Sequence, residues 1–198
     1  MENDSSLLSA AKSMDSDALV KIFDLYSFAL FNYAARLCGD PVLADHIVGD
    51  VFARLLEQLS EGHGPRTNLR SYLYETTYHL IIDETRYSKR RAPLEVAGLL
   101  RPEPESGSPQ MDDQILFKQI LHAMQNVLTD DQRHVIILRF LEEFSLRETA
   151  AIMGKTIDNV KVLQNRAIAA LRKSIENKET RKRVSSPRIR KLSKALGI

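Results

Sequence analysis

The chain has 198 residues, of which 43% are hydrophobic and 27% are charged, with few glycines and prolines. This composition excludes a wholly disordered chain, and the length suits one ordinary domain or two small ones. Cys38 is the only cysteine, which excludes an intramolecular disulfide and a multi-cysteine zinc site. The N-terminal stretch shows no long apolar run, so we expect neither a signal peptide nor membrane insertion, and a cytoplasmic protein.

The net charge of +2 is unevenly distributed along the chain. From Arg172 onward ten basic residues stand against two acidic ones, a local charge of +8 that leaves −6 for residues 1–171. A basic segment of this kind contacts nucleic acid, an acidic partner or only water, and charge alone does not choose between them. Residues 178–198 are therefore set apart as a basic C-terminal extension.

Apolar residues recur with the helical period of 3.6, and strand signals are almost absent, which predicts an all-α protein. After an N-terminal segment, residues 1–15, a first helix is predicted over Ser16–Cys38, with Phe23 among its inward-facing residues. Asp40 and Pro41 suit the N-cap and first position of a second helix, Pro41–Ser60. A third helix follows Asn68 and ends before Pro93.

The helical pattern disappears over residues 94–112, which are rich in Pro, Gly and Ser and have the composition of a linker. The sequence thus predicts two small helical domains, residues 16–93 and 113–177, joined by a Pro-rich linker. In the second domain a helix is expected over about 113–127. Another follows Thr129, which suits an N-cap.

The stretch SLRETAAIMGKTIDNV, residues 145–160, predicts two short helices joined at Gly154. Glycine permits a left-handed turn, and Thr156 can cap the second helix. This spacing is typical of a helix-turn-helix packed on a third helix, here the apolar segment Val135–Leu141. The outer face of the second helix carries polar and basic groups that suit DNA phosphates and base edges. The alternative interpretation is a solvated helix in an ordinary corner.

Tyrosines and cations alternate along the third predicted helix and its end. Aromatic rings stack on unpaired bases and cations follow the backbone, a combination suited to single-stranded DNA. Tyr72 taken alone is better interpreted as a core residue. The residues concerned are Tyr72, Tyr74, Tyr78, Tyr87, Arg70, Arg86, Lys89, Arg90 and Arg91.

Three stretches spanning residues 30–175 together resemble a known family. They are LFNYAARLCGDPVLADHIVGDVFARLLEQL, LRSYLYETTYHLIIDETRYSKRR and LTDDQRHVIILRFLEEFSLRETAAIMGKTIDNVKVLQNRAIAALRKSI. In this order, with a linker between them, they are similar to an alternative sigma factor of the sigma-70 class, of the extracytoplasmic-function (ECF) type that has only regions 2 and 4. The resemblance implies a factor that binds core RNA polymerase and directs promoter recognition and melting.

By that resemblance, the helix Pro41–Ser60 docks on the clamp helices of the largest polymerase subunit through Asp45, Asp50 and Arg54. Leu43, His46 and Gly49 stand where the family usually has acidic, acidic and amide residues, which implies weaker binding to the polymerase.

The resemblance also implies two contacts with promoter DNA. Region 2 would open and read the minus-ten element as single strands, and region 4 would read the minus-thirty-five element as duplex. His79 stands where the family has asparagine, and Tyr72 where it has tryptophan. The implied minus-ten residues are Arg66, Tyr74, Tyr78, His79, Asp83, Arg86 and Arg90. The implied minus-thirty-five residues are Thr156, Asp158, Asn159, Lys161, Asn165 and Arg166.

Other functions find less support in the sequence. The pairs His46 with Asp50 and His79 with Asp83 could each form half a metal site, but no second pair, phosphate loop or nucleophile motif accompanies them. We therefore expect no enzyme, no catalytic residue, no metal and no cofactor. The main alternative is a polymerase-independent helix-turn-helix DNA-binding regulator. An anti-sigma factor is a further candidate partner.

Overall fold

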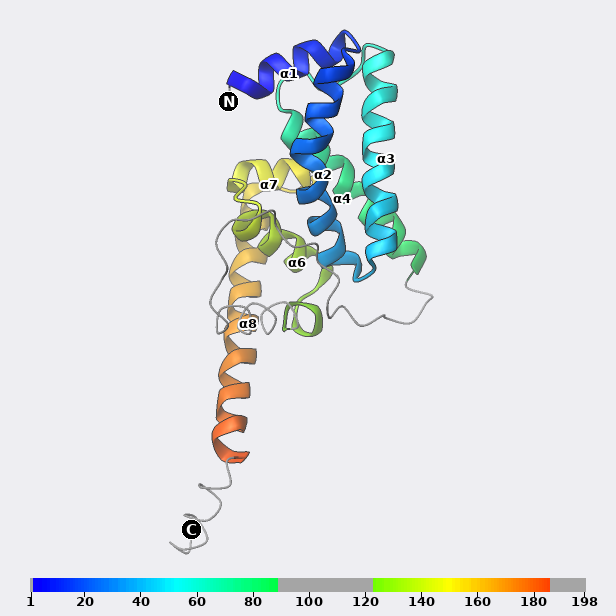
Figure 1. Cartoon of the computed structure of the whole chain (residues 1–198). Coiled ribbons are helices and arrows are strands. Elements are labelled where there is room, and N and C mark those ends of the chain that lie inside the picture. Colours follow the sequence, from blue (N-terminus) through cyan, green and yellow to red (C-terminus); the bar gives the residue numbers. More distant parts are fainter. Residues whose placement is uncertain (1, 89–122, 186–198) are drawn as a thin grey trace, which may run out of the picture. The chain divides into compact units, whose positions relative to one another are not determined.

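The computed structural model describes residues 2–88 and 123–185 of the chain (Figure 1). In order these are α1 (Glu2–Lys12), α2 (Ser16–Cys38), α3 (Pro41–Ser60), α4 (Leu69–Ser88), α6 (Asp130–Ile136), the π-helix η1 (Ile137–Leu141), α7 (Leu146–Ile152) and α8 (Ile157–Ser185). No strand occurs within the described ranges. The prediction of an all-α protein is confirmed.

The chain divides into two compact units. The first unit comprises residues 1–106 and 143–157, and so contains α1 to α4 together with α7. The second comprises residues 107–142 and 158–198, and contains α6, η1 and α8 from its second residue onward. Of the helix predicted over about 113–127, residues 123–127 are helical and the rest lie outside the described residues.

The helices α2 and α3 have the bounds that their sequence predicts, because side chains cap both starts. The Asp15 carboxylate accepts a hydrogen bond from the Ala18 N–H at 2.8 Å, and Gly39, at φ 70°, ends α2. Asp40 Oδ1 accepts from the N–H groups of Val42 and Leu43, at 2.9 and 3.2 Å. These bonds satisfy N–H groups that a helix start leaves without a partner.

The first unit is built around the packing of α2, α3 and α4 on one another. Tyr33, Leu55 and Leu73 are among its fully buried side chains. Tyr33 and Tyr74 lie with ring centroids 5.3 Å apart. The N-terminal segment, for which no helix was expected, forms α1, and Leu8 and Ala11 of α1 are buried.

The expectation that Phe23 faces inward was wrong, since 48% of this residue is exposed. Its ring contacts Phe52 of α3, with centroids 4.8 Å apart. The contact lies at the edge of the apolar stripe rather than inside it, because Ile22 and Tyr26 already occupy the buried side of α2 at this level.

The second unit begins its described part with α6, which carries a capping box. The Thr129 hydroxyl accepts from the Gln132 N–H at 3.4 Å, and the Gln132 side chain accepts from the Thr129 N–H at 3.1 Å. Arg139 Nε donates to Gln164 Oε1 of α8 at 3.1 Å. Val160 and Ala167 of α8 are buried. Among the described helices, none combines the length and apolar character needed to cross a membrane.

Candidate nucleic-acid and polymerase interfaces

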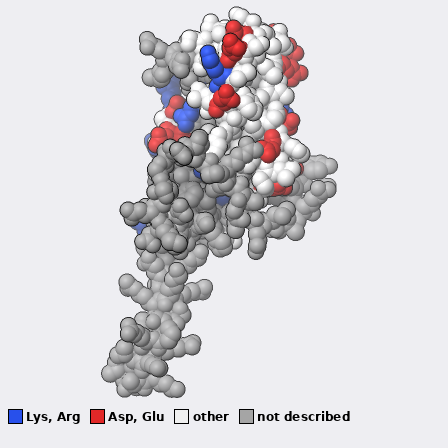
Figure 2. Space-filling model, viewed as in Figure 1, with Lys and Arg blue, Asp and Glu red and all other residues white. Residues whose placement is uncertain are grey.

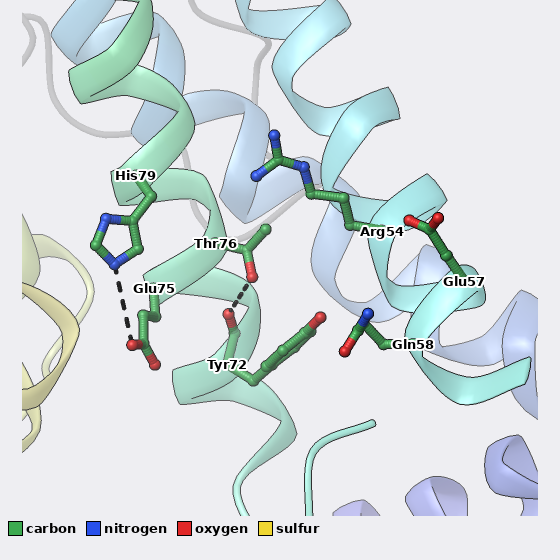
Figure 3. A pocket seen from close by; sticks show the side chains of 7 residues that line it. All are labelled: Arg54, Glu57, Gln58, Tyr72, Glu75, Thr76 and His79. Carbon is green, nitrogen blue, oxygen red and sulfur yellow. Dashed lines mark hydrogen bonds and ion pairs between the residues drawn. The ribbon is translucent and has the colours of Figure 1, made fainter. Parts of the chain in front are cut away.

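A pocket of about 380 Å³ lies between α3 and α4 in the first unit (Figure 3). Its walls are one face of each helix, because residues three, four and seven positions apart share a helix face. From α3 come Arg54, Glu57 and Gln58, and from α4 come Tyr72, Glu75, Thr76 and His79.

The pocket combines an aromatic ring with donors and acceptors of hydrogen bonds. In Figure 3 the Tyr72 ring extends from α4 toward α3, while the guanidinium of Arg54 reaches toward α4. His79 Nε2 lies 4.0 Å from Glu75 Oε1, and about half of each side chain is exposed. Unpaired bases are held by stacking on aromatic or guanidinium planes and by hydrogen bonds at their edges. The pocket has groups for both.

Only part of this pocket was visible in the sequence. His79 was expected to contact DNA, whereas Tyr72 was better interpreted as core and is half-buried against the pocket. Gln58 and Thr76 were not singled out. The sequence does show that residues 54 and 58 share one helix face and that residues 72 and 76 share another. It does not show that these two faces meet, because that depends on how α3 and α4 pack.

The other residues expected at the minus-ten element lie in different surroundings. Tyr74 is 1% exposed and Tyr78 is 7% exposed, so both belong to the core of the first unit. Arg66, in the loop before α4, and Asp83 are exposed. Arg86 lies on α4, where its side chain is not described, and Arg90 lies outside the described residues.

The outer face of α3 carries all three residues expected to contact polymerase. Asp45, Asp50 and Arg54 are exposed. Figure 2 shows acidic side chains in red along the part of the first unit where α3 runs in Figure 1. Apolar residues accompany them on the surface, since Val42 is 62% exposed and Leu56 is 41% exposed. An acidic surface with apolar residues suits a partner with basic and apolar groups.

The segment that precedes α8 begins with a second capping box, at the start of α7. The Ser145 hydroxyl accepts from the Glu148 N–H at 3.2 Å, and Glu148 Oε2 accepts from the Ser145 N–H at 2.8 Å. The hydrogen bonds with Ser145, and to a smaller extent the charge of Arg70, lower the pKa of Glu148. The turn after α7 uses Gly154 at φ 59°, where any other residue would be strained.

The residues expected to contact the minus-thirty-five element lie at the start of α8 and just before it. Lys161 Nζ lies 3.3 Å from Asp158 Oδ1, an exposed pair on the helix surface. Buried Val160 and Ala167 lie on the other side of α8, so the exposed face is open to a ligand. The exposed residues are Thr156, Asp158, Asn159, Lys161, Asn165 and Arg166.

No group of three or more His, Cys, Asp or Glu side chains in the described part of the chain is placed to hold a metal ion. In particular, His79 has Glu75 beside it rather than a second metal-ligating pair.

Two family models match the chain. Sigma-70 region 2 matches residues 22–91, and Sigma-70, region 4 matches residues 126–173. The RNA polymerase sigma-E factor of Streptomyces avermitilis is 30% identical over 153 residues, which cover 76% of this chain and 81% of the relative. The ECF RNA polymerase sigma factor SigW of Bacillus subtilis is 26% identical, covering 84% and 93%. The ECF sigma factor BldN of Streptomyces coelicolor is 26% identical, and the chain spans 63% of its length.

Two solved structures share the fold. CnrH in complex with the cytosolic domain of CnrY superposes with a TM-score of 0.66 at 20% identity, covering 88% of this chain and 97% of that one. The sigma factor RpoE in complex with the anti-sigma factor NepR from Bartonella quintana gives a TM-score of 0.62 at 22% identity, with coverage of 79% and 95%.

Proposed function

Because the chain belongs to the ECF group of the sigma-70 family, and is thus an alternative sigma factor that binds core RNA polymerase and directs promoter recognition, we propose how its surfaces divide this work. Sigma factors are initiation factors and not enzymes. The polymerase-independent regulator considered above is not favoured, since the two matched regions together are those of a sigma factor.

The α3–α4 pocket holds an unpaired base of the minus-ten element in this proposal. The observation that carries this proposal is that Tyr72, Arg54 and Gln58 line one pocket of about 380 Å³. Withdrawing a base from the duplex costs a few kcal/mol of unstacking and unpairing, which stacking and edge contacts in such a pocket offset. His79 and Glu75, which line the pocket from α4 and are about half exposed, contact the nucleotides on either side of that base.

The exposed face of α8 reads the minus-thirty-five element in the major groove. Arg166 and Lys161 contact phosphates or guanine edges, and Asn165 suits adenine. Asp158 is already paired with Lys161 and contributes selectivity rather than affinity. Thr156 and Asn159, at the N-terminal end of the helix, complete the contact surface, and Arg86 and Arg90 follow the backbone of the minus-ten strand.

The outer face of α3 docks on the clamp helices of the largest polymerase subunit. Asp45 and Asp50 supply the acidic groups, and Arg54 borders both this face and the pocket. The linker over residues 94–112 joins a region 2 domain, residues 16–93, to a region 4 domain, residues 113–177. The protein works in the cytoplasm, where polymerase and promoter are, and an anti-sigma factor holds it inactive until released.

In vitro transcription tests the whole proposal. Core polymerase is combined with the protein on a fragmented genomic library, and transcript starts are sequenced. New starts that share two sequence motifs at a fixed spacing are expected. If no such starts appear while the protein alone still binds DNA, and a pull-down finds no core binding, the polymerase-independent function replaces the proposal.

A further inference from the structure

Phe144 occupies a socket on α4 inside the first unit. It lies in the segment just before α7, yet only 1% of it is exposed. The guanidinium carbon of Arg70 lies 4.1 Å from the centroid of its ring, and the Tyr74 ring meets it nearly edge-on with centroids 4.8 Å apart. A cation over an aromatic face and an edge-to-face ring pair are both favourable arrangements.

The socket is held in shape from within the core. Tyr74 also contacts Tyr33 of α2, with ring centroids 5.3 Å apart, and the guanidinium carbon of Arg70 lies 5.6 Å from the Tyr74 centroid. Arg70 and Tyr74 are four residues apart on α4 and therefore share one face. This face of α4 therefore presents one guanidinium and one phenol ring to Phe144.

Two local features flank Phe144 along the chain. Glu143 has φ 56°, a left-handed conformation that non-glycine residues rarely adopt. Ser145 begins the capping box of α7. The pKa of Glu148 in this box is lowered by its hydrogen bonds with Ser145 and, to a smaller extent, by the charge of Arg70. The contact of the Arg70 guanidinium with the Phe144 ring thus attaches the start of α7 to α4.

We infer that Phe144 is an intramolecular latch that holds α7 on α4 and keeps the Arg70–Tyr74 socket from single-stranded DNA until the latch opens. Guanidinium and phenol groups are also what an unpaired base stacks on. Phe144 and a base therefore compete for one surface. This inference rests on the proposed single-strand contact of region 2, with Arg70 added to it as a base-stacking residue.

A single fluorescent reporter tests the latch directly, because the chain contains no tryptophan. The Phe144→Trp variant places one in the socket, and Phe140→Trp places one at a position of η1 that is 52% exposed. Iodide should quench the reporter at 144 several-fold less than that at 140. A mixed-sequence DNA single strand of about twelve nucleotides, long enough for such a site, should raise quenching at 144 and leave 140 unchanged. Equal quenching at both positions without DNA would overturn the latch.

Phe144→Ala provides a second measurement that does not require a tryptophan to fit. Hydrogen exchange of the α7 amides should accelerate, and the same single strand should bind more tightly. If the latch is closed in about nine of ten molecules, the gain is roughly tenfold. Phe140→Ala is the matched control and should change neither.

The outcomes separate the latch from the proposed function. Quenching and hydrogen exchange without DNA need neither polymerase nor promoter. Unchanged exchange in α7 after Phe144→Ala overturns the latch, whatever transcription shows. Faster exchange with unchanged DNA affinity overturns the competition between Phe144 and a base. A failed transcription assay with a responsive reporter overturns the assignment of promoter contacts alone.

Discussion

Phe23 of α2 and Phe52 of α3 lie with ring centroids 4.8 Å apart and planes inclined by 54°, at the border between the core and the outer face of α3. About half of Phe23 is exposed. The pair therefore joins two helices at a point where the apolar core reaches the surface.

This pair should contribute to stability beyond the apolar area that it buries. Aromatic pairs add about 0.5–1.5 kcal/mol in such measurements. We expect a double-mutant cycle of Phe23→Ala and Phe52→Ala, followed by urea unfolding, to give a coupling free energy in this range. Strictly additive losses would mean that the two rings stabilise the unit independently.

Asp50→Ala should weaken binding to core polymerase by about tenfold, since charge-pair losses at interfaces commonly exceed 1 kcal/mol. Binding of α8 to duplex DNA should stay unchanged. Affinity for core polymerase is measured by fluorescence anisotropy, with Asp17→Ala, an exposed aspartate of α2, as control. Equal affinities for both variants would place the polymerase contact elsewhere.

Arg166→Ala should weaken binding to minus-thirty-five duplex DNA. A phosphate contact predicts a uniform loss and a decrease of about one in the salt slope, whereas a bidentate guanine contact predicts a loss of about 1–3 kcal/mol confined to one base pair. Titrations at several salt concentrations, on sites varied one pair at a time, distinguish the two. Lys173→Ala removes an exposed cation farther along α8 and should change the affinity less.

Tyr72→Ala should impair promoter opening while leaving binding to polymerase intact. Base stacking on an aromatic ring contributes about 1–3 kcal/mol, so the open complex should become at least several-fold less populated. Tyr72→Phe retains the ring and should open promoters nearly as well. Permanganate reactivity of unpaired thymines measures opening, and equal reactivity of the alanine variant would exclude stacking at Tyr72.

The charge of Glu148 should make stability depend on pH. Its hydrogen bonds with Ser145 lower its pKa below the ordinary 4.5. A carboxyl with a lowered folded-state pKa stabilises the fold above the unfolded-state value and loses this contribution as pH falls through the folded-state value. We expect the stability advantage of the native chain over Glu148→Gln to decrease below about pH 4.5. The glutamine can still accept the capping bond but cannot titrate.

Urea unfolding between about pH 3 and 6 covers both sides of this transition. Glu57→Gln, at the pocket rim, serves as the control for loss of an exposed carboxylate. A difference between the native chain and Glu148→Gln that stays constant over this range would contradict the assignment.

The sequence predicted elements best where local chemistry specifies their ends. Asp40, Pro41 and Gly39 act within a few residues, so α2 and α3 have the predicted bounds. The helix α1 was missed because its mean hydropathy is low and few of its residues face the core. Its formation depends on packing against α2 and α3, which no local pattern reveals.

The candidate sites were predicted as helix faces, not as cavities. The helical spacing of apolar residues in α8 predicts which face is exposed, and all six residues expected to contact the minus-thirty-five element are exposed. The tyrosines of α4 were harder to interpret, since Tyr72, Tyr74 and Tyr78 look alike in sequence. Their surroundings differ because Tyr74 meets Tyr33 and Phe144, from segments remote along the chain.

The π-helical turn at Ile137–Leu141 has a consequence for comparing this chain with its relatives. Such a turn accommodates more residues than an α-helical turn over the same rise, so Glu142 bonds back to Ile137, five positions earlier. Phe140 and Leu141, in the last part of this turn, are 52% and 37% exposed. A relative that is purely α-helical here should therefore align with this chain only if a gap of one residue is placed in the relative. For the same reason, deletion of one residue from this turn is the length change that this part of the chain should tolerate best.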